Sequence, residues 1–181
     1  MKKLPVLYSL ILLISFLFQA CEVENCPPNA LSFAHFTLVD QHGRQLTTSV
    51  PTSIIGVIKE DIVIKKQLPD GTVIEETVCD SMIRDTLINK EQNMKSFKVP
   101  LSYTDETQFI IDYDGKQQDY ITVQHRNVPY FLNIDCGTMM FHEVTGVSAS
   151  QGIDSIQIIN PNIDNYEKEN FKIYFTVADN Q

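Results

Sequence analysis

Apolar and polar residues alternate with a period of two along most of the chain after residue 30. The apolar runs are short, rich in Ile, Val, Phe, Tyr and Thr, and separated by turn residues, which is typical of half-buried antiparallel strands. The pattern predicts strands at 32–40, 54–59, 62–68, 73–79, 95–101, 108–113, 120–125, 130–135, 139–144, 153–159 and 171–177. The stretch 83–95 has the best helical spacing, but Thr86 and two asparagines interrupt it, so we expect little helix.

Three short segments have the chemistry of tight turns, and each lies between two β-type runs: 41–43 (Gln-His-Gly), 69–71 (Pro-Asp-Gly) and 114–115 (Asp-Gly). Asp-Gly supplies the positive φ that hairpin turns need. Many short strands joined in this way predict an all-β fold, an antiparallel β-sandwich of immunoglobulin-like type, rather than a parallel α/β fold. A small β-barrel is the second possibility.

The first 20 residues have the pattern of a secretory signal peptide. Two lysines precede an apolar run that ends at Phe18, and this run is shorter than the roughly 20 residues of a membrane-spanning helix, which is the alternative interpretation. Ala20 is the small residue that a signal peptidase requires, and Cys21 provides a thiol for lipid attachment. The segment 18–21 (Phe-Gln-Ala-Cys) resembles a bacterial lipobox, in which leucine is usual at the position of Phe18.

These features predict a signal peptide at 1–20, a lipidated N-terminus with a short linker at 21–30, and a single β-sandwich domain at 31–181. Acyl chains such as palmitate contribute about 0.8 kcal/mol per buried methylene, so two or three chains on Cys21 would hold the protein on a membrane permanently. We expect a lipid-anchored protein of the cell envelope, on the outer membrane. Glu22 and Glu24 fit transport to the outer face of that membrane and equally fit a solvated spacer.

The mature chain is acidic. Residues 1–20 contain two of the 14 basic residues and none of the 23 acidic residues, so 12 bases remain against 23 acids and the formal charge is −11. Nucleic acid is therefore not an expected partner, because phosphate binding depends on clustered Lys and Arg. About 160 residues suit one domain with its own core.

Three cysteines remain besides Cys21, and export places them in an oxidising compartment. The odd number favours one disulfide and one free thiol, with the pairing left open. A Cys26–Cys136 bridge would fasten the N-terminal segment to the sheet, with Cys79 buried and free. No Cys-x-x-Cys pair occurs, which argues against a redox role and a zinc knuckle.

No familiar catalytic motif occurs, and we expect no enzymatic activity, no cofactor and no metal ion. The chain has four histidines: His35, His42, His125 and His142. All except His42 lie in predicted strands, where a sheet could bring them together as metal ligands. His35 is expected to point to solvent, opposite Phe36. His142 and Glu143 are adjacent in a strand and should face opposite sides, so they cannot bind one ion without a bulge.

Acidic and aromatic residues give the remaining candidates. Residues 112–115 with Asp119 resemble a calcium loop, but an ordinary hairpin turn is favoured because the distal Glu of such loops is missing. Glu143, Asp154 and Asp164 could contribute to a carboxylate pair for glycoside hydrolysis. Seven aromatic residues could line a ligand surface, although most are expected in the core or as cross-strand partners: Tyr103, Tyr113, Tyr120, Tyr130, Phe131, Tyr166 and Tyr174.

A series of short motifs follows in order along the mature chain: Cys21, Cys26-Pro27, 99–102 (Val-Pro-Leu-Ser), Phe109, 119–123 (Asp-Tyr-Ile-Thr-Val), 135–137 (Asp-Cys-Gly), Phe141, 154–156 (Asp-Ser-Ile), 160–163 (Asn-Pro-Asn-Ile) and 171–175 (Phe-Lys-Ile-Tyr-Phe). In this order the chain resembles small lipoproteins of Bacteroidota-type bacteria that are known only as a domain of unknown function. The resemblance implies a lone exported domain, supports the Cys26–Cys136 bridge, and suggests that Cys79 and residues 62–90 are additions. It implies no activity.

Three functional hypotheses follow. The first is a non-enzymatic accessory or binding subunit that meets an envelope protein through loops and exposed strand edges. The second is glycan or peptide binding at a cleft with clustered exposed aromatic residues. The third is a hydrolase with an unrecognised carboxylate site.

Overall fold

The computed structural model describes residues 26, 31–134, 136–150 and 152–177. These residues form ten strands and no helix: β1 (Phe33–Asp40), β2 (Thr52–Gln67), β3 (Val73–Glu91), β4 (Ser96–Pro100), β5 (Glu106–Tyr113), β6 (Gln117–Asn133), β7 (Gly137–Ala149), β8 (Ser155–Ile158), β9 (Asn162–Ile163) and β10 (Phe171–Phe175). Within the described residues, nothing forms a helix with the length and hydrophobicity that crossing a membrane requires. The predicted all-β class is confirmed.

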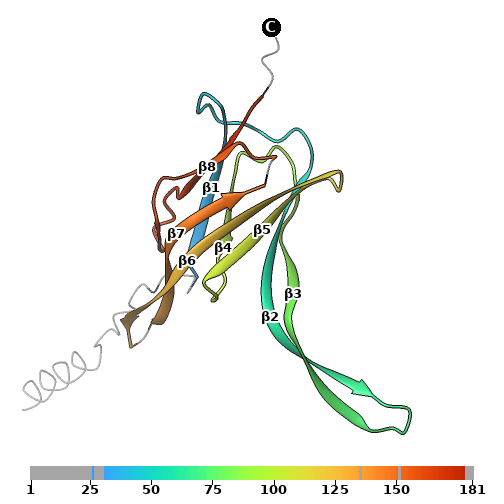
Figure 1. The fold of residues 1–181 in the computed structure, drawn as a ribbon. Coiled ribbons are helices and arrows are strands. Elements are labelled where there is room, and N and C mark those ends of the chain that lie inside the picture. The colour runs from blue at the N-terminus through green and yellow to red at the C-terminus, as the bar shows by residue number, and fades with distance from the viewer. Residues whose placement is uncertain (1–25, 27–30, 135, 151, 178–181) are drawn as a thin grey trace, which may run out of the picture.

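The strands form two sheets, a four-stranded sheet in the order β4-β1-β10-β8 and a six-stranded sheet in the order β3-β2-β5-β6-β7-β9 (Figure 1). Neither sheet closes into a barrel, and the arrangement is that of a β-sandwich. The pairing is antiparallel except between β1 and β10, which run parallel. The N-terminal and C-terminal strands therefore lie side by side in the smaller sheet.

Several predicted strands are parts of longer ones. The runs 54–59 and 62–68 form the single strand β2, because a register shift between Glu60 and Ile62 lets the strand continue past a charged segment. The runs 120–125 and 130–135 likewise form β6. Pro129 is tolerated there because β5 pairs with β6 only as far as Gln124. The run 73–79 continues to Glu91 in β3, so most of the stretch with the best helical spacing is strand.

Four phenylalanines join the two sheets at the core. The Phe36 ring of β1 stacks on Phe97 of β4 and on Phe171 of β10, with ring centroids 4.8 and 4.5 Å away. From the six-stranded sheet, Phe109 meets Phe36 edge-on at 5.9 Å. All four side chains are buried, and each such pair adds about 0.5–1.5 kcal/mol beyond the burial of apolar area.

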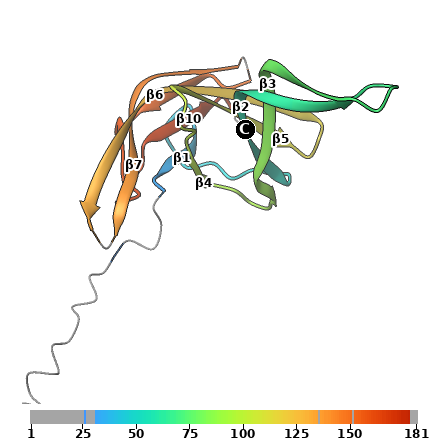
Figure 2. The ribbon, with the colours of Figure 1, turned by 90° about the horizontal axis from the view of Figure 1, so that it is seen from below.

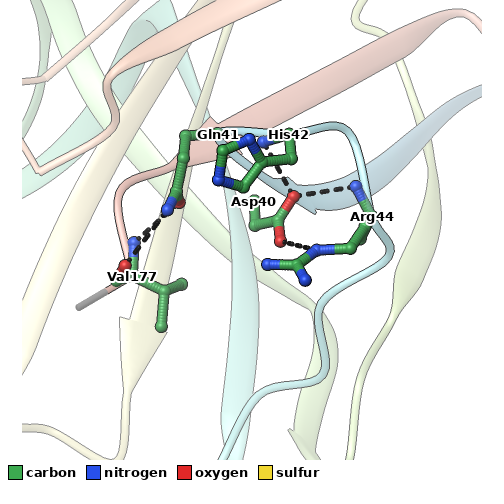
Figure 3. Close-up of polar contacts among 5 residues, drawn as sticks. All are labelled: Asp40, Gln41, His42, Arg44 and Val177. Carbon is green, nitrogen blue, oxygen red and sulfur yellow. Dashed lines mark hydrogen bonds and ion pairs between the residues drawn. The ribbon is translucent and has the colours of Figure 1, made fainter. Parts of the chain in front are cut away.

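The turn after β1 is held by the buried carboxylate of Asp40 (Figure 3). Its Oδ1 accepts hydrogen bonds from the amides of His42 and Arg44 at 2.9 and 2.8 Å, and its Oδ2 accepts one from Arg44 Nε at 2.6 Å. Burial raises the pKa of Asp40, but the hydrogen bonds from Arg44 and His42 outweigh it and lower the pKa below the usual value. Gln41 exchanges two hydrogen bonds with the backbone of Val177, so the turn fastens the chain that follows β10.

The three predicted turns are confirmed, with one difference. The turns at 69–71 and 114–115 close the β2–β3 and β5–β6 hairpins, and Gly71, Asp114 and Gly115 adopt the expected positive φ. The turn at 41–43 leads only to an isolated bridge between Val39 and Gln45 rather than to a second strand.

A disulfide joins Cys26 to Cys136, with the two Cα atoms 5.3 Å apart, which confirms the predicted pairing. Cys136 lies between β6 and β7, where its amide donates to Oδ1 of Asn133 at 2.7 Å. The bridge spans 110 positions and corresponds to roughly 5 kcal/mol in the chain-entropy account of disulfides. The lipidation predicted at Cys21 and the burial predicted for the Cys79 side chain lie outside the described part of the chain.

Candidate functional site

The ends of β2 and β3 form a two-stranded arm that leaves the body of the sandwich (Figures 1 and 2). β5 pairs with β2 only from Thr52 to Val57, whereas β2 and β3 pair with each other out to Gln67 and Val73. We call residues 58–83 the arm. Within the described residues no strand pairs with either outer edge of the arm, so both edges present backbone groups for pairing.

One face of the arm is mostly apolar. The register places Ile62 opposite Val78 and Lys66 opposite Ile74, and Ile64 lies between them on the same face. The side chains of Ile64, Ile74 and Val78 are 40, 39 and 36% exposed. β-Branched residues favour a strand, but here they meet water instead of a second layer.

The opposite face of the arm is mixed. Lys65 Nζ lies 3.2 Å from Glu75 Oε1 in an ion pair that is exposed on both sides. Such pairs contribute about 0–1 kcal/mol, so this one does little to hold the arm together. Val63 and Val73, also on this face, are exposed as well.

A groove of about 480 Å³ lies along β6, β7 and the segment that follows β9. Tyr130 of β6 stacks on Phe141 of β7 at a centroid distance of 5.0 Å and forms part of its wall. Tyr166 contributes from the segment after β9 and is among the most exposed aromatic residues of the described chain. An ion pair between Arg126 and Glu143 completes the polar part of the lining.

The structure therefore brings two of the seven candidate aromatic residues, Tyr130 and Tyr166, to one groove. Five of the seven are exposed: Tyr103, Tyr120, Tyr130, Phe131 and Tyr166. The expectation that most are core residues or cross-strand partners is nevertheless confirmed, because five lie opposite a residue of a paired strand: Tyr113, Tyr120, Tyr130, Phe131 and Tyr174. The cross-strand role is confirmed for Tyr130 through its stack on Phe141. The ligand-binding hypothesis requires exposed aromatic side chains that lie close together. Tyr130 and Tyr166 meet this requirement in the groove.

Two of the three candidate carboxylates also line the groove. Glu143 forms an ion pair with Arg126, and Asp164 Oδ1 accepts a hydrogen bond from the amide of Tyr166 at 2.9 Å. Asp154 is not part of the groove and instead accepts a hydrogen bond from Thr176 at 2.6 Å.

His142 is part of the lining of the groove, and it contacts His125 next to it. Their rings are perpendicular with centroids 5.0 Å apart, and both side chains are buried. His125 Nε2 lies 2.9 Å from Thr107 Oγ1, and His142 Nδ1 lies 2.8 Å from Asn127 Oδ1. Nδ1 of His125 is buried and has no hydrogen-bond partner.

Both histidines are held neutral by their surroundings. Burial lowers the pKa of His142 to about 4, and the neighbouring His125 contributes to this shift. Burial also lowers the pKa of His125, although Asn127 and Asp105 act against it. Two neutral, buried imidazole rings in contact are consistent with a packing role. Glu143, next to His142 in β7, faces the opposite side of the strand, as predicted, and pairs with Arg126.

The other two histidines lie apart from this pair. His35 belongs to β1 opposite Lys98, on the face away from Phe36 as predicted. It is nevertheless half-buried, and its Nδ1 is buried without a hydrogen-bond partner, so the prediction that it points to solvent is wrong. His42 lies in the turn after β1. Among the described residues no group of three or more His, Cys, Asp or Glu side chains is placed to hold a metal ion.

The segment 112–115 is a hairpin turn, as predicted. Asp112 accepts hydrogen bonds from the amide of Gly115 and from Gln118, whereas Asp119 is buried and accepts one from Ser150. Asp119 lines a separate, mainly apolar cavity of about 440 Å³ together with Tyr113. Burial and then the negative charge of Asp119 raise the pKa of Tyr113.

A family model described as a family of unknown function (DUF6452) matches residues 73–175. The match begins at the first residue of β3 and ends at the last residue of β10. Residues 73–90 therefore belong to the matched region, whereas the sequence resemblance suggested that they are an addition. No curated protein and no solved structure matches the chain.

The buried His142 predicts a pH-dependent stability. Its pKa falls from 6.5 to about 4 on folding, so between these pH values the unfolded chain binds a proton that the folded chain does not. The free energy of unfolding should therefore decrease as the pH falls from 6.5 to 4. In His142→Gln this slope should be flatter, as measured by urea denaturation at a series of pH values, while His42→Gln, a change at an exposed histidine, should keep it. An unchanged slope in His142→Gln would contradict this account.

Proposed function

Since this chain belongs to the family of unknown function DUF6452, we propose a function from its own geometry: it is a lipid-anchored, non-enzymatic protein of the bacterial cell envelope that binds a partner protein through its arm. The main support for the proposal is the arm, which has an exposed apolar face and outer edges that pair with no strand of the described residues.

The membrane anchor is supported by the N-terminal sequence. A basic start, a short apolar run and Ala20-Cys21 are the features of a lipoprotein signal peptide. The Cys26–Cys136 disulfide supports an exported location, because such bonds persist in oxidising compartments. We place the mature protein on the outer membrane, held by acyl chains on Cys21.

Partner binding is supported by the physics of the arm. An isolated two-stranded hairpin is marginally stable in water, because it has no second layer on which to bury its apolar face. Exposed hydrophobic strand edges also promote aggregation unless something covers them. A partner that adds a strand to an edge or packs on Ile64 and Ile74 would remove both costs by burying apolar area and pairing backbone groups.

A role without catalysis is supported by the state of the carboxylates in the groove. Glycoside hydrolysis needs one carboxyl group that holds a proton and a second that is free to act on the sugar or on water. Glu143 is paired with Arg126, and Asp164 is engaged by the amide of Tyr166. Both carboxylates are therefore already engaged in structural contacts within the groove.

The aromatic groove supports a second candidate function, the binding of a glycan or peptide. Tyr130 and Tyr166 present ring faces and hydroxyls, which suit ligands with both apolar and polar faces. Arg126 and Glu143 supply charged hydrogen-bonding groups in the same groove.

The arm proposal predicts site-specific cross-linking in intact cells. A photoreactive benzoylphenylalanine at position 64 should give a discrete protein adduct, whereas the same group at position 103, which is exposed but lies between β4 and β5, should not. Adding Ile74→Asp should reduce the adduct at position 64 roughly tenfold, equivalent to about 1.4 kcal/mol of binding. Equal adducts at the two positions, or none at position 64, would reject the arm as the binding surface.

The groove proposal makes a separate prediction. Tyr166→Ala should abolish retention of the protein on an array of oligosaccharides and peptides, and Tyr103→Ala, at an equally exposed tyrosine outside the groove, should leave retention unchanged. Absence of retention for the unaltered protein would remove this second candidate.

A further inference from the structure

The end of the β6–β7 hairpin is a second exposed apolar feature, separate from the arm. We call residues 131–134 and 136–138 the tip. Phe131 at the end of β6 is 62% exposed, and Ile134 in the connecting turn is 92% exposed. Tyr130 precedes Phe131 and is 47% exposed. Large apolar side chains therefore meet water at the end of this hairpin. The end of the β6–β7 hairpin projects from the sandwich (Figure 1).

The sequence around the tip is depleted in charge. Residues 127–141 contain a single charged residue, Asp135, whereas 20% of the whole chain is charged. The same stretch contains Tyr130, Phe131 and Phe141. Aromatic and aliphatic residues without neighbouring charges are typical of protein surfaces that lie at a membrane–water interface.

The disulfide holds the lipidation site close to the tip. Cys136 belongs to the tip, and its bridge brings the Cα of Cys26 to within 5.3 Å. Cys21 precedes Cys26 by five residues, and five residues of extended chain reach about 18 Å at most. Since the disulfide adds the 5.3 Å between the Cα atoms of Cys26 and Cys136, any acyl chains on Cys21 enter the bilayer within about 23 Å of Cys136.

We propose that the tip is a membrane-contact surface, in which Phe131 and Ile134 enter the interfacial region of the bilayer that holds the lipid anchor. This inference rests on the proposed lipidation of Cys21. The short tether raises the local concentration of lipid at the tip, so a modest apolar surface suffices to keep it in contact. Two attachments, the anchor and the tip, then fix the orientation of the sandwich on the membrane.

The orientation has a consequence for the arm. The tip and the arm leave the six-stranded sheet at different places and in diverging directions (Figure 2). Contact of the tip with lipid therefore leaves the arm in the aqueous phase, where a protein partner can reach it.

Single tryptophans test this proposal, because the chain contains no tryptophan of its own. Full-length Phe131→Trp and Met82→Trp proteins are purified from membranes and reconstituted into phosphatidylcholine vesicles. Met82 is a matched control, since it is 60% exposed but lies on the arm. Lipids brominated near the headgroup end of their acyl chains should quench the fluorescence of Phe131→Trp, since interfacial side chains reach about 5–10 Å into this region. The emission of Phe131→Trp should also shift to shorter wavelength on reconstitution, and Met82→Trp should show neither effect.

Fatty-acid labelling and vesicle flotation of the same proteins separate the anchor from the tip. Labelled protein that floats with vesicles while Phe131→Trp is quenched no more than Met82→Trp would overturn the tip proposal and leave the anchor intact. Protein that takes up no label, behaves identically after Cys21→Ser and does not float would overturn both. Quenching confined to the Phe131→Trp variant in labelled, floating protein supports both.

Discussion

The stack of Phe36 between Phe97 and Phe171 forms the centre of the four-stranded sheet, which packs on the six-stranded sheet. The four-stranded sheet can bury the larger sheet only over the length of its own strands. The strands of the smaller sheet have 4 to 8 residues, whereas β2, β3 and β6 have 16, 19 and 17. At about 3.4 Å per residue, the longer strands extend well past the layer that buries their inner faces. This mismatch in strand length determines where the protein exposes apolar surface.

The two projecting hairpins differ in how they are supported. The tip of β6–β7 is fastened by the Cys26–Cys136 bridge and stays close to the N-terminal segment that leads to Cys21. The arm has no such cross-link among its described contacts, and its exposed Lys65–Glu75 ion pair adds little. The disulfide thus ties one hairpin to Cys26, five residues after the proposed anchor, whereas the hairpin that we propose for partner binding has no such link among the described residues. The two hairpins project in diverging directions (Figure 2).

Sequence alone predicted the sandwich, because the alternation of apolar residues and the Asp-Gly turns are local signals, and the family resemblance supported the disulfide. The sequence did not predict that neighbouring runs fuse into long strands. Glu60-Asp61 and Pro129 resemble strand breaks, and they are tolerated only because β5 does not pair with β2 beyond Val57 or with β6 beyond Gln124. The extent of pairing by a third strand is a tertiary property that local composition does not encode.

The candidate surfaces likewise depend on tertiary structure that the local sequence does not encode. Period-two alternation identifies apolar faces such as that of Ile62 and Ile64, but whether a second layer covers the face depends on strand lengths elsewhere in the chain. The groove needs Tyr166 beside Tyr130, and the pairing of β9 with β7 brings these distant residues together. The charge-poor stretch 127–141 is visible in the sequence, but the sequence predictions made no use of it, and its place at the end of a projecting hairpin is known only from the structure.

Hydrogen–deuterium exchange of the protein in isolated native membranes, compared with the detergent-purified protein, tests most directly whether both projecting hairpins are binding surfaces. If both hairpins are binding surfaces, amides of 62–78 and 131–138 should exchange rapidly after purification and slowly in the membrane, while those of 109–111 in the core should exchange slowly in both. Rapid exchange of both hairpins in the native membrane would contradict this account.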